Sequence, residues 1–307
     1  MNLVKVAFAL AFVVAGTTIE SPTATAQTPA PQQLHNSRIR IEYQEPRYLK
    51  TYQRLKARQV LEELDELMSP LRLDHDLKLT IEDNTSDCRG DDPNSFYDPN
   101  DYTVHICYNF FDMLNNGASV QNYKNASDFR LTTTGLMPGV KPAEVIVGGT
   151  IGVALHEIGH AIFHNLNVPR LGREEDAADQ IAAFIMLQFG PSVAIPVIKG
   201  TFNVWHHLQA VSLNASGGGI SSSSQADVHS LSLQRAMNFL CLAYGSPDSA
   251  SFKGLADQWL TDERKANCQS EYKTALVAFT KTILPRVDQD RMKKVLAMQI
   301  FRPEDFQ

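Results

Sequence analysis

Two histidines and a glutamate stand at a spacing that suits a bound metal ion. His156, Glu157 and His160 form the pattern H-E-x-x-H in a segment, Val145 to Phe163, that contains no lysine or arginine. On a helix the two histidines lie one turn apart on one face, about 6 Å along the axis. Their imidazoles can converge on one ion, while the glutamate can take a proton from bound water. Burying three such groups unpaired is costly, which favours a metal over histidines that only hydrogen-bond to the backbone.

A third metal ligand is expected from another segment, because a catalytic zinc takes three protein ligands and a water. The sequence GREEDAADQ opens a further predicted helix, on which Glu175 and Asp179 are four residues apart and share a face. We predict that Glu175 binds the metal and that Asp179 accepts the free N–H of a ligating histidine. Glu174 and Asp176 are assigned to an acidic first turn that complements the helix dipole, which is also the alternative for Glu175.

An H-E-x-x-H helix followed by E-x-x-x-D on the next helix resembles the gluzincin clan of zinc metallopeptidases. More closely, the chain resembles a bacterial family of metallopeptidases known mainly as a domain of unknown function, through HEIGHAIFHNLNVPRLGREEDAADQIAAF, NSFYDP, HICY and CLAYG. The resemblance implies His156, His160 and Glu175 as ligands of one Zn²⁺ per chain and Glu157 as the catalytic base. Metzincins are less similar, because they have a third histidine where this chain has Leu166.

The resemblance also implies a reaction, in which zinc and Glu157 activate a water that attacks a peptide carbonyl. A second donor to the developing oxyanion is then expected. Our candidate is His229, oriented by Asp227 in the sequence Asp-Val-His. The alternative, equally weighted, is that Asp227 caps the helix that follows.

The first 26 residues have the layout of a signal peptide. Lys5 precedes the apolar run Val6 to Ala15, and the sequence Ala-Thr-Ala at 24–26 fits a cleavage site. The run is too short for a membrane anchor, which needs about 20 apolar residues. We therefore expect an exported protein, periplasmic or secreted, with no stable membrane anchor after cleavage.

Four cysteines are present, and none stands in a C-x-x-C pair of the kind that holds a structural zinc. In an oxidising compartment an even number favours two disulfides, and three pairings are possible. Proximity in sequence favours Cys88 with Cys107 and Cys241 with Cys268. Free buried thiols are the alternative.

The predicted fold class is α+β and zincin-like, with a small, mainly antiparallel sheet, an active-site helix and a helical C-terminal half. After the signal peptide we expect a flexible lead-in over 27–46 and a single metallopeptidase-like domain over 47–307. The α/β part of that domain spans about 47–166 and the helical part about 167–307.

Hydrophobic periodicity predicts a helix over 47–68, a strand over 77–82 and a hairpin over 96–108. Residues 116–140 are expected to form a long surface loop, and 214–225 a mobile linker rich in serine and glycine. Further helices are predicted near 142–165, 173–189, 192–212, 229–244, 249–259 and 262–284. The hairpin could pair with an extended substrate or could be only a disulfide-tied sheet edge.

The net charge of the chain argues against one class of function. With 28 basic and 34 acidic residues the net charge is −6, which argues against a general nucleic-acid binder.

The leading hypothesis is an exported zinc metallopeptidase acting on a peptide or protein substrate. The alternative is a non-catalytic binding protein on the same scaffold, although such a protein would not need the glutamate base. The sequence does not determine the oligomeric state.

Overall fold

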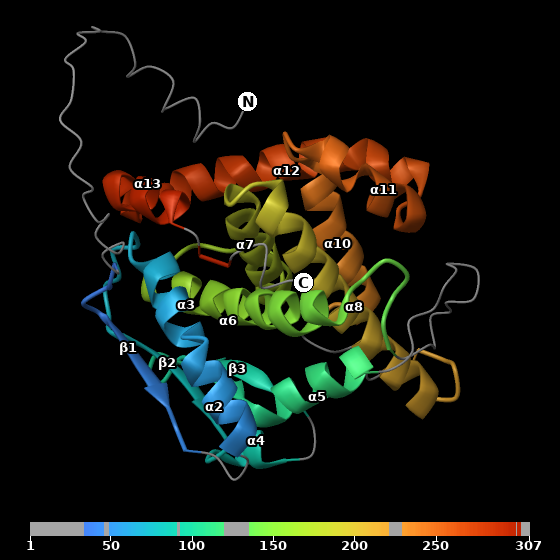
Figure 1. The fold of residues 1–307 in the computed structure, drawn as a ribbon. Coiled ribbons are helices and arrows are strands. Elements are labelled where there is room, and N and C mark those ends of the chain that lie inside the picture. The colour runs from blue at the N-terminus through green and yellow to red at the C-terminus, as the bar shows by residue number, and fades with distance from the viewer. Residues whose placement is uncertain are drawn as a thin grey trace, which may run out of the picture. The chain divides into compact units, whose positions relative to one another are not determined.

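The computed structural model describes residues 34–45, 49–90, 93–119, 135–220, 229–298 and 300–301. The predicted signal peptide, most of the 116–140 loop and Asp227 lie outside these ranges. Residues Leu34–Gln307 form one compact unit. The fold class is α+β, with a small sheet beside a larger helical part, and one helix, α6 (Gly149–Asn165), runs between the two (Figure 1).

Four strands form the sheet in the order β1-β2-β4-β3: β1 (Ile39–Tyr43), β2 (Leu77–Glu82), β3 (Ser95–Asp98) and β4 (Thr103–Cys107). The strand β2 lies parallel to both β1 and β4, and only β3 and β4 are antiparallel. The prediction of a mainly antiparallel sheet is therefore wrong, because the observed sheet is mixed. The chain between β1 and β2 forms helices, and the chain between β2 and β4 contains a short helix and β3, so both connections are long enough for parallel pairing, which a short turn cannot provide.

The predicted hairpin is confirmed as β3 and β4, although Tyr108 begins the helix α5 (Tyr108–Ser119) instead of extending the strand. Strand β1 was not expected, because it falls in the predicted lead-in. It is held by Asn36, which is buried and donates from its side chain to the carbonyls of Met68 and Leu71. The sheet thus begins before the predicted domain boundary.

The predicted helix over 47–68 is two helices, α2 (Leu49–Ala57) and α3 (Val60–Met68). Gln59 separates them with φ 56°, in the left-handed region that few residues other than glycine adopt. A short helix, α4 (Ser86–Arg89), follows β2. The sequence carries no glycine or proline at residue 59 to signal the break.

The central helix α6 (Gly149–Asn165) continues from a π-helical turn, η2 (Glu144–Gly148). Every residue of α6 except His164 is buried. The segment Glu144–Asn165 is long and apolar enough to cross a membrane, yet most of it is buried inside the protein. Its apolar composition is that of a core helix packed on all sides.

The helical half follows the predicted order. It contains α7 (Glu174–Gln188), α8 (Pro191–Ala215), α10 (Ser232–Gly245), α11 (Ser249–Trp259), α12 (Asp262–Thr282), the short 3₁₀ turn η3 (Leu284–Arg286) and α13 (Gln289–Ala297). The helix α8 extends past the predicted start of the serine- and glycine-rich linker. The helix α13 was not predicted. Helices α7, α8 and α10 pack against one another, and α6 packs on α7 and α8, so four helices meet where the predicted ligands lie.

Both predicted disulfides are present, Cys88–Cys107 and Cys241–Cys268. The first ties α4 to the end of β4, and the second ties α10 to α12. Among the described residues no cysteine is free. Two disulfides fit an oxidising environment outside the cytoplasm.

Candidate metal centre

Close packing of α7 on α6 brings the predicted ligands together. Gly159, inside the H-E-x-x-H pattern, faces Ala178 of α7, and a Cβ at Gly159 would lie only 3.0 Å from the Ala178 Cα. Any larger residue at position 159 would push the helices apart. The close approach sets Glu175, one turn before Ala178, beside the two histidines of α6.

The three predicted ligands lie together. The Nε2 atoms of His156 and His160 are 3.2 Å apart, and Glu175 Oε2 is 3.1 Å from the first and 3.3 Å from the second. One ligand atom from each residue lies within 4.8 Å of the others, and no other His, Cys, Asp or Glu of the described residues joins them. Two imidazoles and one carboxylate therefore point at one spot.

The other ring nitrogen of each histidine is held by a carboxylate. His156 Nδ1 lies 2.8 Å from Asp179 Oδ1, as predicted for this residue. His160 Nδ1 lies 2.9 Å from Glu174 Oε1. A carboxylate at Nδ1 keeps the proton there and leaves the Nε2 lone pair for a metal.

The donor atoms fit a metal ion of the size of zinc. Tetrahedral ligands at 2.0–2.1 Å from an ion are about 3.4 Å apart, close to the three separations in this group. With both Nδ1 atoms protonated, two lone pairs and a carboxylate oxygen of Glu175 face each other in the buried group. Such an arrangement is repulsive unless a positive charge lies between them.

The pKa values of His156 and Glu175 also indicate that positive charge stabilises this group. Burial lowers the pKa of His156, but its hydrogen bonds with Asp179 and Glu175 outweigh burial and raise the pKa to about 9. Burial alone would raise the pKa of Glu175, but hydrogen bonds with His156, His160 and His229 lower it well below its usual range. Without a metal, protons supply the charge, and a divalent cation can replace them.

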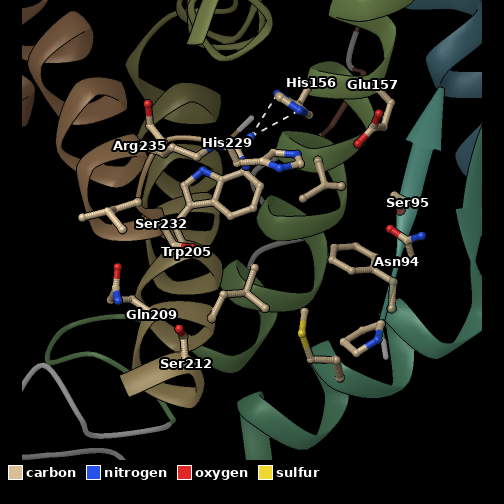
Figure 2. A pocket seen from close by; sticks show the side chains of 17 residues that line it. Asn94, Ser95, His156, Glu157, Trp205, Gln209, Ser212, His229, Ser232 and Arg235 are labelled. Atoms are coloured by element: carbon tan, nitrogen blue, oxygen red, sulfur yellow. Dashed lines mark hydrogen bonds between the residues drawn. The ribbon is translucent and has the colours of Figure 1, made fainter. Parts of the chain in front are cut away.

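An arginine completes the support of His156. Arg235 of α10 donates to Asp179 from Nε at 2.7 Å and from Nη2 at 2.9 Å, and the Nη2 atom is also 3.2 Å from both nitrogens of the His156 ring. Its guanidinium carbon lies 3.9 Å from the centre of the Trp205 ring, over that ring. Figure 2 shows the end of the Arg235 side chain beside both the His156 ring and the Trp205 ring. The guanidinium holds Asp179 in place and offsets its charge.

Glu157 projects from α6 beside His156, toward the pocket (Figure 2). It is buried, and burial raises the pKa of its carboxyl, although His156 and His160 oppose this shift. A carboxylate whose affinity for a proton is raised in this way suits a general base that must later release the proton.

The three residues whose ligand atoms converge, His156, His160 and Glu175, are called the metal group below. His229, predicted as a donor to the oxyanion, lies beside the metal group. Its Nε2 atom is 3.2 Å from Glu175 Oε2, and about half of its side chain is exposed. It is not one of the three converging ligands. The residue predicted to orient it, Asp227, lies outside the described residues.

Two cavities meet at the metal group. One, of about 360 Å³, extends from it toward Trp205 and Gln209, and the other, of about 890 Å³, extends toward Tyr97 and the start of α7. Five of the lining residues are shared by the two cavities: Asn94, Ser95, His156, Glu157 and His229. The edge strand β3 therefore lies along a cleft that passes the metal group on both sides.

Sequence reasoning missed three residues of the site. Glu174 was assigned to the helix dipole, yet it holds His160. Arg235 is the only charged residue of α10, and a lone charge in an apolar helix was a usable signal. Trp205 carried no signal, because its role depends on the packing of α8 against α10.

Comparison with protein families shows one match. The model of a family described as "Putative metallopeptidase" matches residues 41–282, which contain every described residue of the metal group. No curated protein and no solved structure shows significant similarity to the chain.

Proposed function

Since the chain belongs to this family of metallopeptidases, we propose that it is a zinc-dependent peptidase that hydrolyses peptide bonds with Glu157 as the base. The proposal is supported chiefly by one observation, the convergence of His156 Nε2, His160 Nε2 and Glu175 Oε2. A structural zinc site usually has four protein ligands, whereas three ligands leave one position for water or substrate. A set of two imidazoles and one carboxylate is typical of catalytic zinc.

When bound, zinc would lower the pKa of a coordinated water and polarise the peptide carbonyl. In our proposal Glu157 accepts the proton of the attacking water on its carboxylate. It then donates this proton to the leaving amine nitrogen. Asp179 and Glu174 keep the two imidazoles in the tautomer that offers Nε2 to the metal. His229 donates from Nε2 to the carbonyl oxygen of the scissile bond, where negative charge develops.

The strand β3 supports a role in binding an extended peptide. It is the outer strand of the sheet, with β4 on one side only, so one row of its backbone N–H and C=O groups faces away from the sheet. Residues 94–97 line the cleft beside Glu157. A peptide that adds to this edge would pass the metal group.

We also propose that the enzyme is exported. The two disulfides, Cys88–Cys107 and Cys241–Cys268, support an oxidising compartment. The predicted signal peptide over residues 1–26 adds the route. Cell fractionation will distinguish a periplasmic protein from a secreted one.

The test combines metal analysis with a protease assay. The purified protein should carry about one zinc per chain and cleave peptides of a quenched fluorescent library, and a chelator should abolish cleavage. Glu157→Gln should keep the zinc and lower kcat at least a hundredfold. The matched control is Glu144→Gln, which alters a buried glutamate of the adjoining turn η2 outside both cavities and should retain activity. Wild-type rates in Glu157→Gln would show that this residue is not the base.

A further inference from the structure

Among the described residues, three arginines and no lysine line the two cavities that meet at the metal group. Two of them are paired with carboxylates. Arg235 donates to Asp179 at 2.7 Å, and Arg170 lies 2.7 Å from Glu174. Their charges are used to hold the side chains that orient the histidines, so they are not available to a substrate.

The third arginine, Arg173, is exposed and lies in the wall of the larger cavity. Among the described residues, its side chain makes one hydrogen bond, from Nη1 to Ser230 Oγ at 3.5 Å, beyond the usual range for such bonds. Among the described residues no carboxylate lies within 4.0 Å of its guanidinium. Arg173 therefore presents to the cleft a guanidinium that has no ionic partner among the residues the structure describes.

The position of Arg173 in the chain places it near the metal group. It is the residue before the first turn of α7, two positions before Glu175. The residue that it contacts, Ser230, directly follows His229. Arg173 thus lies between the segment that carries the predicted ligand Glu175 and the segment that carries the proposed oxyanion donor His229, in the wall of the same cavity.

Glu174 and Glu175, the two acidic residues that directly follow Arg173, already have partners. Glu174 contacts both His160 and Arg170, and Glu175 faces His156 and His160. Neither carboxylate forms an ion pair with Arg173. A guanidinium in such a position binds carboxylates well, because it donates two parallel hydrogen bonds.

We propose that Arg173 binds a carboxylate of the substrate and so makes the enzyme select acidic peptides. This inference rests on the proposed peptidase function. The carboxylate can be the side chain of an aspartate or glutamate close to the cleaved bond, or the C-terminal carboxylate of a short peptide. Both sources share the same chemistry, and the experiment separates them.

The experiment compares three series of quenched fluorescent peptides of one parent sequence. The first carries a glutamate, moved in turn through the positions around the cleaved bond, and an amidated C-terminus. The second has glutamine in place of that glutamate, and the third has glutamine and a free C-terminal carboxylate. We expect kcat/KM to be about tenfold or more higher for the first or the third series than for the second, mainly through KM. The series that shows the gain identifies the source.

Variants of Arg173 test the assignment. In Arg173→Gln the ratio between the carboxylate and glutamine peptides should fall to about one, and in Arg173→Lys part of it should return. In Arg173→Glu the preference should turn to peptides with lysine at the same position. The matched control is Arg40→Gln, an exposed arginine of β1 outside both cavities, which should keep the wild-type ratio. An unchanged ratio in Arg173→Gln, or a wild-type ratio near one in both series, would overturn the proposal.

A binding measurement keeps this test separate from the test of peptidase activity. Titration calorimetry of the zinc-loaded Glu157→Gln protein with the same uncleaved peptides should show the same preference for a carboxylate. The preference should be lost when Arg173→Gln is added. If the wild-type protein cleaves no peptide but this binding preference is found, the proposed function fails and the role of Arg173 stands. If cleavage occurs without the preference, the role of Arg173 fails alone.

Discussion

Replacement of Asp179 by asparagine should weaken both the fold and the metal site. The Asp179 carboxylate receives hydrogen bonds from Arg235 at 2.7 and 2.9 Å and lies 2.8 Å from His156 Nδ1. The side chains of Asp179 and Arg235 are 4% and 6% exposed, so the substitution leaves a buried arginine without its counter-charge. Removal of one partner of a buried ion pair costs about 3–5 kcal/mol. The lost contact to His156 should weaken zinc binding about 10–100-fold.

The assay must separate these two effects. Denaturant unfolding in the presence of a chelator measures the loss of stability without any contribution from bound metal. Competition with a coloured chelator then measures the zinc affinity of the folded protein. We expect Asp179→Asn to lower the free energy of unfolding of the metal-free protein by about 3 kcal/mol or more.

Two further variants make the reasoning refutable. Asp176→Asn alters an aspartate of the same helix whose Oδ1 has no hydrogen-bond partner among the described residues, and it should cost less than about 1 kcal/mol. The double variant Asp179→Asn with Arg235→Met removes the stranded charge and should recover part of the lost stability. If Asp179→Asn costs no more than Asp176→Asn and leaves zinc affinity unchanged, the role given to Asp179 is wrong.

Two other predictions concern Glu174, which contacts His160, and the buried His206 of α8. Glu174→Gln should weaken zinc binding about tenfold, because an amide holds the His160 Nδ1 proton less strongly than a carboxylate, and competition titration will detect the change. Burial lowers the pKa of His206 to about 4, so between pH 6.5 and 4 only the unfolded chain takes up this proton and stability falls as the pH is lowered. His206→Leu should reduce that fall by up to about 3 kcal/mol, which unfolding curves at pH 7, 5.5 and 4.5 will show; identical pH profiles of the two proteins would contradict the assignment.

The metal group could be predicted because its information is local. His156 and His160 need only the period of one helix, and the same period places Glu175 and Asp179 on one face of the next. The structure brings all four together. The contact of Glu174 with His160 was missed, because helix period alone does not say how far α7 is rotated against α6.

Arg235 was missed for a different reason. It lies 56 residues after Asp179 in the chain, and only the packing of α10 against α7 brings the two together. A single charge in an apolar helix indicates a buried partner but does not name it. His229 was proposed from its place in the sequence, and the structure places it beside Glu175.

The sheet shows the same limit. The hairpin of β3 and β4 is local and was predicted, whereas the parallel pairing of β1 with β2 and of β2 with β4 joins distant segments. Strand β1 reads as part of a polar lead-in because only one of its five residues, Ile39, is buried. The break between α2 and α3 depends on a left-handed backbone conformation at Gln59, and the residue type glutamine does not predict that conformation.

The measurement that tests the account most directly is a crystal structure of the zinc-loaded protein with anomalous data at the zinc absorption edge. We expect one zinc peak per chain, with His156 Nε2, His160 Nε2 and a carboxylate oxygen of Glu175 at about 2.0–2.2 Å and a fourth position open to water. A zinc bound elsewhere, a fourth protein ligand closing the site, or Glu175 turned away from the ion would contradict the account.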